Sequence, residues 1–336
     1  MTVDIAARIA REMGVGEHQV ERTIRLLDEG NTIPFIARYR KEMTGGLNEE
    51  QIRRVQERCG QLRNLQERRD EITRRIEELG KMTPELAKAI QAAETLAELE
   101  DLYRPFRPKR KTRASVAREK GLAPLAEWLL RDGTGDVLDM ASSYVSAEKQ
   151  VATPEEALQG ALDIVAETVA DDAAIRRWLR EWMHQRGVLV SRAQDPERES
   201  VYEAYYDYRE EVRKIPPHRI LAVNRGEREG ALKVDIEVPD DDLWPRLEKL
   251  ALSRHASPRI SAEVRRLLIA AVRDAYRRLM APAVEREIRN QLTEKAEEQA
   301  IRIFAENVRQ LLLQPPVRGK VVLGVDPAYR TGGKLA

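Results

Sequence analysis

One row of apolar residues near the C-terminal end constrains the fold most. Its members recur at every fourth position: Val284, Ile288, Leu292, Ala296, Ala300, Phe304, Val308 and Leu312. Each such step advances about 40° beyond a full helical turn, so the row winds roughly 280° around a helix on the order of 47 Å long. Different turns of this helix must be covered from different directions. The row therefore predicts a long central helix over 282–313 with other parts of the protein around it.

Composition favours a mainly α-helical chain. Charged residues make up 34% of the sequence and aromatic residues only 5%, as expected for charged amphipathic helices. No apolar run approaches the about 18 residues of a membrane span, and the first residues lack a secretion signal, so we expect a cytoplasmic protein. Cys59 is the only cysteine, and no Cys/His spacing suggests a metal site, so no disulfide, metal or cofactor is expected.

Helix caps and turn residues divide the chain into five expected parts. These are helix-turn-helix-like helices over 1–60, a helical region with a basic segment over 61–200, a segment with a β-hairpin over 201–260, long central helices over 261–316, and the start of another domain over 319–336. Three short apolar rows separated by Gly14 and Gly30 predict the first helices. Asn48 and Gln51 form a capping pair that predicts the start of the next one.

A small β-hairpin is expected between the helical parts. The apolar residues 220–223 precede a turn at 225–230, and apolar and charged side chains alternate over 232–238. Such alternation is typical of a strand with one face in water. The nearby tyrosines leave two interpretations open, since they could stack on bases or form the edge of a core.

Three cations crowd the end of the third predicted helix. Arg38, Arg40 and Lys41 follow Phe35 and Ile36, which we expect to be buried. Cations gathered in this way could contact phosphates. The alternative, a helix end that is only solvated, stays equally open at this point.

A second basic cluster lies in the segment from Arg104 to Arg118, which contains seven Lys or Arg residues and no acidic residue. Pro105 and Pro108 favour an extended backbone, and an extended cationic segment can follow a phosphate backbone. The candidate phosphate-binding residues are Arg107, Lys109, Arg110, Lys111 and Arg113. The alternative is a loop whose arginines pair with nearby acids such as Glu98, Glu100, Asp101 and Glu119.

The last segment changes character. Val321–Val325 is a continuous apolar run of the kind buried within a sheet, and Asp326 follows it. This pattern resembles the first metal-binding acid of ribonuclease-H-like nucleases. Two-metal chemistry needs several acids, so we expect 319–336 to be the start of an incomplete α/β domain. Asp326 would bind a metal only in a complete domain, and we expect no catalysis here.

Four motifs, in this order along the chain, carry a family resemblance: TIPFIARYRKEMTGG, EDLYRPFRPKRKTRASVAREKGL, KIPPHRILAVNRGEREGALKV and VLGVDPAYRTG. Together they resemble the bacterial Tex family of transcription accessory proteins. The resemblance implies further domains downstream, namely a YqgF-type ribonuclease-H-like domain that is generally not a working nuclease, helix-hairpin-helix units and an S1 domain. Ala328 and Gly333 depart from the family pattern.

The resemblance and the basic clusters together predict a non-enzymatic function. We expect the N-terminal part of a Tex-like protein that binds RNA or DNA through phosphates without reading bases. One alternative is a helical scaffold for protein partners such as RNA polymerase or ribosome-associated proteins. Another is the remnant of a metal-dependent nuclease.

Overall fold

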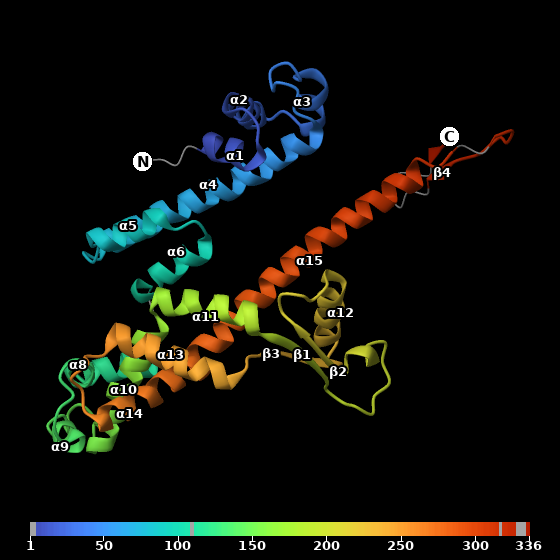
Figure 1. Ribbon diagram of the computed structural model, residues 1–336. Helices are drawn as coiled ribbons and strands as arrows, with labels where there is room; N and C mark the ends of the chain where they lie inside the picture. The colour runs from blue at the N-terminus through green and yellow to red at the C-terminus, as the bar shows by residue number, and fades with distance from the viewer. Residues whose placement is uncertain (1–4, 108–110, 316–317, 327–333) are drawn as a thin grey trace. The chain divides into compact units, whose positions relative to one another are not determined.

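The computed structural model describes residues 5–107, 111–315, 318–326 and 334–336. The helices of its first half are α1 (Ile5–Met13), α2 (Glu17–Asp28), α3 (Ile33–Tyr39), α4 (Glu49–Glu78), α5 (Pro84–Ala92), α6 (Leu96–Tyr103), α7 (Arg113–Glu119), α8 (Ala123–Arg131), α9 (Val137–Ser142) and α10 (Pro154–Ala170). Those that follow are α11 (Ala173–Arg186), α12 (Pro217–Arg228), α13 (Asp240–His255), α14 (Ala262–Asp274) and α15 (Ala281–Leu312). The strands are β1 (Val188–Ala193), β2 (Asp207–Glu211), β3 (Leu232–Glu237), β4 (Val325–Asp326) and β5 (Lys334–Leu335). The predicted mainly α fold class is confirmed (Figure 1).

The chain forms two units. The first contains Met1–Glu181 and Asp240–Val284, and the second contains Trp182–Pro239 and Glu285–Ala336. The finer division into five parts stays a prediction.

In the first unit, α1, α2 and α3 pack on the N-terminal half of α4. Two apolar clusters hold them there, one with Ile9, Val20, Val55 and Cys59, the other with Leu26, Ile36, Leu47 and Ile52. The predicted capping pair is confirmed, because the backbone N–H of Gln51 donates to Asn48 Oδ1 at 2.8 Å and that of Asn48 donates to Gln51 Oε1 at 2.9 Å.

Arg69 occupies a core position on α4. Only 2% of it is exposed, although its neighbours along the same face are the apolar Leu65, Ile72 and Ile76. Its guanidinium donates to the carbonyl of Ile90 at 3.2 Å and to that of Ala93 at 2.8 Å. Carbonyls at a helix end lack partners within the helix, so Arg69 satisfies the C-terminal end of α5 from a neighbouring helix.

Glu12 ties α1 to α4. Arg58 donates to its two carboxylate oxygens at 2.7 and 2.8 Å. This hydrogen-bonded pair, opposed by burial and helped by Arg8, lowers the pKa of Glu12 from 4.5 to about 2.

The lowered pKa of Glu12 predicts an acid-sensitive contribution to stability. It is present above pH 4.5, where the unfolded carboxyl is also ionised, and is lost as the pH falls toward about 2. Both side chains are about a third exposed, so we expect about 1 kcal/mol or less. In thermal unfolding, Glu12→Gln should lower Tm at about pH 6 and do so less at about pH 3. An equal Tm difference at both pH values would contradict this.

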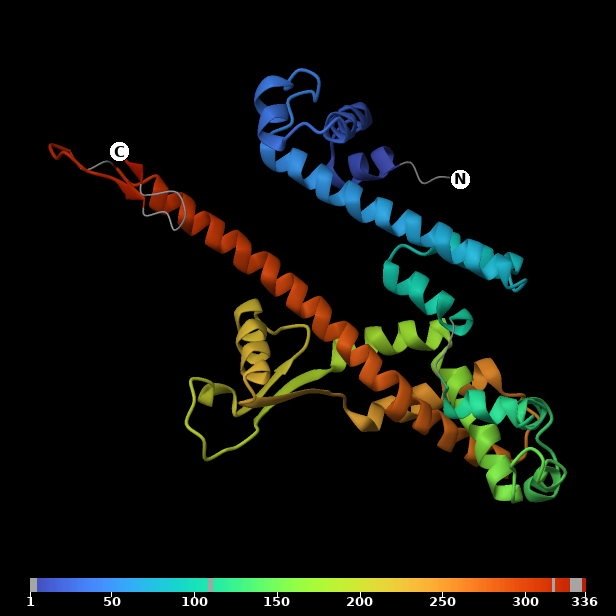
Figure 2. The ribbon, with the colours of Figure 1, turned by 180° about the vertical axis from the view of Figure 1, so that it is seen from behind.

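Helix α10 is the centre of a second group of helices in the first unit. It packs against α7, α8, α9 and α14, which Figure 2 shows from behind. Its buried face is rich in alanine, and at Gly160 an added Cβ would lie 2.4 Å from Leu122 Cδ1. Small side chains therefore let the neighbouring helices approach α10 closely.

The second unit contains a three-stranded antiparallel sheet in the order β2, β1, β3. Leu189, Val223, Val234 and Ala296 bring β1, α12, β3 and α15 into one apolar core. Tyr202 is buried in this core and its hydroxyl donates to Glu229 at 2.9 Å; Tyr205, Tyr206 and Tyr208 pack at its edge. The interpretation of these tyrosines as a core edge is confirmed.

The predicted hairpin is wrong in its first arm. Residues 217–228 form α12, whereas β3 confirms the alternating arm at 232–237. Pro217 stands in the first turn of α12, and the buried Ile220 and Val223 lie three residues apart on one face, which suits a helix. The partner of β3 is β1, which the sequence pattern did not predict.

The predicted long helix exists, but it is covered over only part of its length. Val284, Ile288 and Ala296 are buried, whereas Phe304 is 69% and Leu312 is 78% exposed. The expectation of cover on every turn is therefore wrong for the last turns. The core of the second unit reaches α15 only as far as Ala296, and no other described residues of that unit bury the rest.

The predicted apolar strand is also too long. Val321, Val322 and Leu323 are exposed and lie outside any strand, and only Val325–Asp326 forms β4, which pairs with β5. An apolar strand is buried only where a sheet receives it, and the described residues of 319–336 provide just this two-residue pairing.

Candidate nucleic-acid interface

The end of α3 presents three exposed cations. Ile36 is fully buried and fixes α3 in its cluster, while Arg38, Arg40 and Lys41 are exposed. None of the three forms an ion pair with a described residue. Their charge is therefore available to a ligand.

Tyr39 stands among these cations, and the sequence prediction did not include it. It is 67% exposed, and its ring lies 5.3 Å from that of Phe35, over which the Arg40 guanidinium sits at 5.2 Å. An exposed aromatic ring beside cations suits a platform for stacked bases. The order Arg-Tyr-Arg at 38–40 was the signal in the sequence.

The turn after α3 is held in place by Gln19 of α2. Its side-chain amide donates to the carbonyl of Gly45 at 2.8 Å, and its Oε1 accepts the backbone N–H of Gly16 at the same distance. Gly45 has a positive φ of 64°, and a Cβ there would lie 2.4 Å from the Gln19 amide nitrogen. The turn that carries Lys41 is thus tied to α2.

The basic segment is not extended at its two ends. Residues 104–106 form a 3₁₀ turn with Pro105 in its first positions, and Arg113 begins α7. Proline also fits the first turn of a helix, which explains the difference. Lys109 and Arg110 lie outside the described residues.

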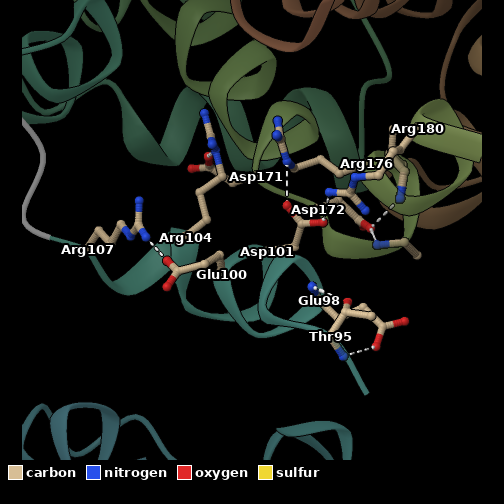
Figure 3. A network of polar contacts seen from close by, with 12 residues as sticks. Thr95, Glu98, Glu100, Asp101, Arg104, Arg107, Asp171, Asp172, Arg176 and Arg180 are labelled. Carbon is tan, nitrogen blue, oxygen red and sulfur yellow. Dashed lines mark hydrogen bonds and ion pairs between the residues drawn. The ribbon is translucent and has the colours of Figure 1, made fainter. Parts of the chain in front are cut away.

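Three arginines of this segment pair with acids, as Figure 3 shows for two of them. Arg104 lies 3.0 Å from Asp171, Arg107 pairs with Glu100, and Arg118 lies 2.5 Å from Glu167. The carboxylate of Glu100 also accepts a hydrogen bond from Arg68 at 2.6 Å. Two cations therefore share the charge of Glu100.

Lys111 and Arg113 differ from these arginines. Both are exposed, and neither pairs with an acidic side chain among the described residues. Of the described candidate residues in this segment, Lys111 and Arg113 leave their charge most available.

A buried ion network anchors α6, the helix that precedes the basic segment. Asp101 of α6 is 5% exposed and accepts hydrogen bonds from Arg176 at 2.7 Å and Arg180 at 2.6 Å, both from α11 (Figure 3). Arg176 is fully buried. The network fixes α6, and with it the start of the basic segment, to α11.

Asp172 makes a second junction at the start of α11. Its Oδ1 accepts the backbone N–H groups of Ala174 and Ile175, and its Oδ2 lies 2.7 Å from Arg254 and 2.9 Å from His255. Burial raises the pKa of this carboxyl, but the contacts from His255 and Arg254 outweigh burial and lower it overall.

The two predicted basic clusters attach to different stretches of α4. The apolar residues that hold α3 include Ile52 of α4, and the apolar residues that hold α6 include Ile72 of α4. At 1.5 Å per residue these points are about 30 Å apart along the helix. The structure does not bring the two sets of cations into one site.

Asp326 lies in β4, and the described residues contain no group of three His, Cys, Asp or Glu side chains able to hold a metal ion. Among the described helices, none has the length and apolar character that crossing a membrane requires.

Two long stretches of this sequence match known protein families. Residues 3–77 match the Tex-like protein N-terminal domain, and residues 132–304 match the family described as Tex central region-like. The chain therefore belongs to the Tex family.

Individual relatives agree with this assignment. YdcI of Bacillus subtilis is 50% identical over 98% of this chain and 46% of its own length. The transcriptional accessory protein Tex of Neisseria gonorrhoeae is 38% identical over 99% and 44%, and the human S1 RNA-binding domain-containing protein 1 is 32% identical over 93% and 32%. The chain spans less than half the length of each of these relatives.

Proposed function

We propose that this chain is a non-enzymatic part of a transcription accessory protein that binds RNA or DNA through phosphates. The observation that carries the proposal is the set of exposed cations Arg38, Arg40 and Lys41, which lack acidic partners among the described residues and stand on a fixed turn beside Tyr39. The names of two relatives, a transcriptional accessory protein and an S1 RNA-binding domain protein, support it. The net charge of the chain is only +1, so such binding depends on local clusters.

The basic segment adds a second set of phosphate contacts to the proposal. Lys111 and Arg113 contribute unpaired charges, and Arg107 shares its acidic partner with Arg68. Lys109 and Arg110 complete the set by sequence. Charges of this kind bind the backbone without distinguishing bases.

Replacing all of Arg38, Arg40 and Lys41 by Gln should weaken binding of a single-stranded RNA or DNA oligonucleotide. Three lost phosphate contacts should make the slope of log K against log salt shallower by about 2. The measurement is fluorescence anisotropy at several salt concentrations. The Ala variant of Lys109, Arg110, Lys111 and Arg113 should act in the same direction.

The matched control removes three exposed arginines that already have helical acid partners, Arg25, Arg53 and Arg74. It changes the net charge equally but should leave the slope nearly unchanged. If neither cluster variant alters affinity or slope, phosphate binding is overturned. The function is then better explained as a scaffold for protein partners such as RNA polymerase, which the exposed apolar end of α15 supports.

A further inference from the structure

A pocket of about 370 Å³ lies next to the unpaired cations of the basic segment. Small-molecule sites commonly enclose about 300–1,000 Å³. The pocket is bounded by α7, the residues before α8, and one face of α10. Val116 is half-buried and gives the pocket apolar surface, whereas Ala117 and Leu122 are buried and pack directly against Gly160 of α10.

The rim of this pocket is cationic. Lys111 and Arg113 line it and form no ion pair with a described acid, although Arg113 lies close enough to Asp163 to lower the pKa of that carboxyl. Lys120 also lines it, but its ammonium group is engaged by Glu156 at 2.8 Å and by the carbonyl of Gln150 at 2.7 Å. An anionic group of a ligand would therefore be held by Lys111 and Arg113.

A buried carboxylate also lines the pocket. Asp163 of α10 is 8% exposed, and its nearest cation is Arg278, whose Nη2 lies 3.4 Å from Oδ1. Burial raises the pKa of Asp163, while Arg278, Arg113 and a hydrogen bond from the side chain of Gln159 oppose that rise. A carboxylate has about four acceptor positions, so this group can accept further hydrogen bonds from a ligand.

We propose that the pocket binds a nucleotide, with its phosphate on Lys111 and Arg113, its base against Val116, and its base N–H groups donating to Asp163. Guanine suits this arrangement best, because its adjacent ring N–H and amino group can donate to both oxygens of one carboxylate. The inference rests on the proposed function and adds a base-selective contact beside phosphate contacts that are not selective. The nucleotide belongs either to a nucleic-acid strand or to the free pool.

The test compares guanosine 5′-monophosphate with uridine 5′-monophosphate on the full chain by isothermal titration calorimetry, with inorganic phosphate as competitor. We expect the guanine nucleotide to bind about tenfold more tightly. A second arm compares an oligouridine of about 16 nucleotides with the same strand carrying one central guanosine. Tighter binding of the guanosine strand assigns the site to nucleic acid, whereas preference for the free nucleotide alone assigns it to the free pool.

Two variants separate a base contact from a structural role. Asp163→Asn replaces one acceptor by a donor, so the preference should shift from guanine toward uracil, which a loss of stability alone does not cause. Arg113→Gln should weaken both nucleotides by the same factor and leave their ratio unchanged. Glu119→Gln, an exposed acid on the same helix, is the control and should change neither.

Equal affinity for the two nucleotides would overturn the inference, as would an Asp163→Asn variant with an unchanged preference. Failure of the proposed function appears differently. If oligouridine binds with a steep salt dependence but guanine is not preferred, only the pocket is wrong. If guanine is preferred but binding does not depend on salt, the proposed binding of nucleic-acid phosphates is wrong, whereas the proposed nucleotide site in the pocket is supported.

Discussion

Asp101→Ala is expected to destabilise the first unit by about 3–5 kcal/mol. The substitution leaves Arg176, which is fully buried, and Arg180 without the carboxylate that accepts their hydrogen bonds. Removing one partner of a buried charge is strongly unfavourable because water cannot replace the lost carboxylate. The measurement is the urea midpoint of unfolding followed by circular dichroism.

The matched control for Asp101 is Asp28→Ala. Asp28 also accepts two hydrogen bonds from one arginine, Arg63, at 2.7 and 2.8 Å, but its side chain is 50% exposed. Surface pairs contribute at most about 1 kcal/mol. If the two substitutions shift the midpoint equally, burial of the Asp101 network does not set its importance.

Arg69→Met should destabilise the same unit by about 2–5 kcal/mol. Methionine fills much of the volume but donates no hydrogen bond, so the carbonyls of Ile90 and Ala93 lose their guanidinium donor. Arg69→Lys should recover part of the loss, since an ammonium group can reach one carbonyl. Urea unfolding of both variants measures the effect.

Arg74→Met controls for the loss of a charge on the same helix. Arg74 is exposed and lies 3.9 Å from Glu78, and such surface substitutions usually stay within about 0.5 kcal/mol. An Arg69→Met variant as stable as this control would show that the α5 carbonyls need no arginine.

Elements with local signals were predictable from the sequence. The capping pair of α4 needs only Asn48 and Gln51, which lie three residues apart, and the structure contains it. The first arm of the hairpin failed because a short apolar run such as 220–223 fits a helix and a strand equally well. The surrounding structure determined which of the two formed, because β3 pairs with β1 and not with residues 220–223.

The supports of the candidate sites were not predictable in the same way. Asp101 and Arg176 are far apart in sequence and meet only because α6 and α11 pack together. The sequence did mark the position of Arg69, because this residue interrupts an apolar row. The carbonyls at the end of α5 that accept its hydrogen bonds could not be predicted from that interruption. Exposed cations such as Arg38 were recognisable by type, whereas their lack of acidic partners among the described residues required the structure.

The order of segments in the second unit affects how this unit folds while the chain is being synthesised. Its β-sheet shares one core with Ala296 of α15, a residue that leaves the ribosome roughly a hundred positions after the first strand, at about 5–20 residues per second. For several seconds of synthesis the nascent sheet lacks its helical cover, with the apolar faces of Leu189 and Val234 open to other chains. This interval is when a chaperone would help the protein most.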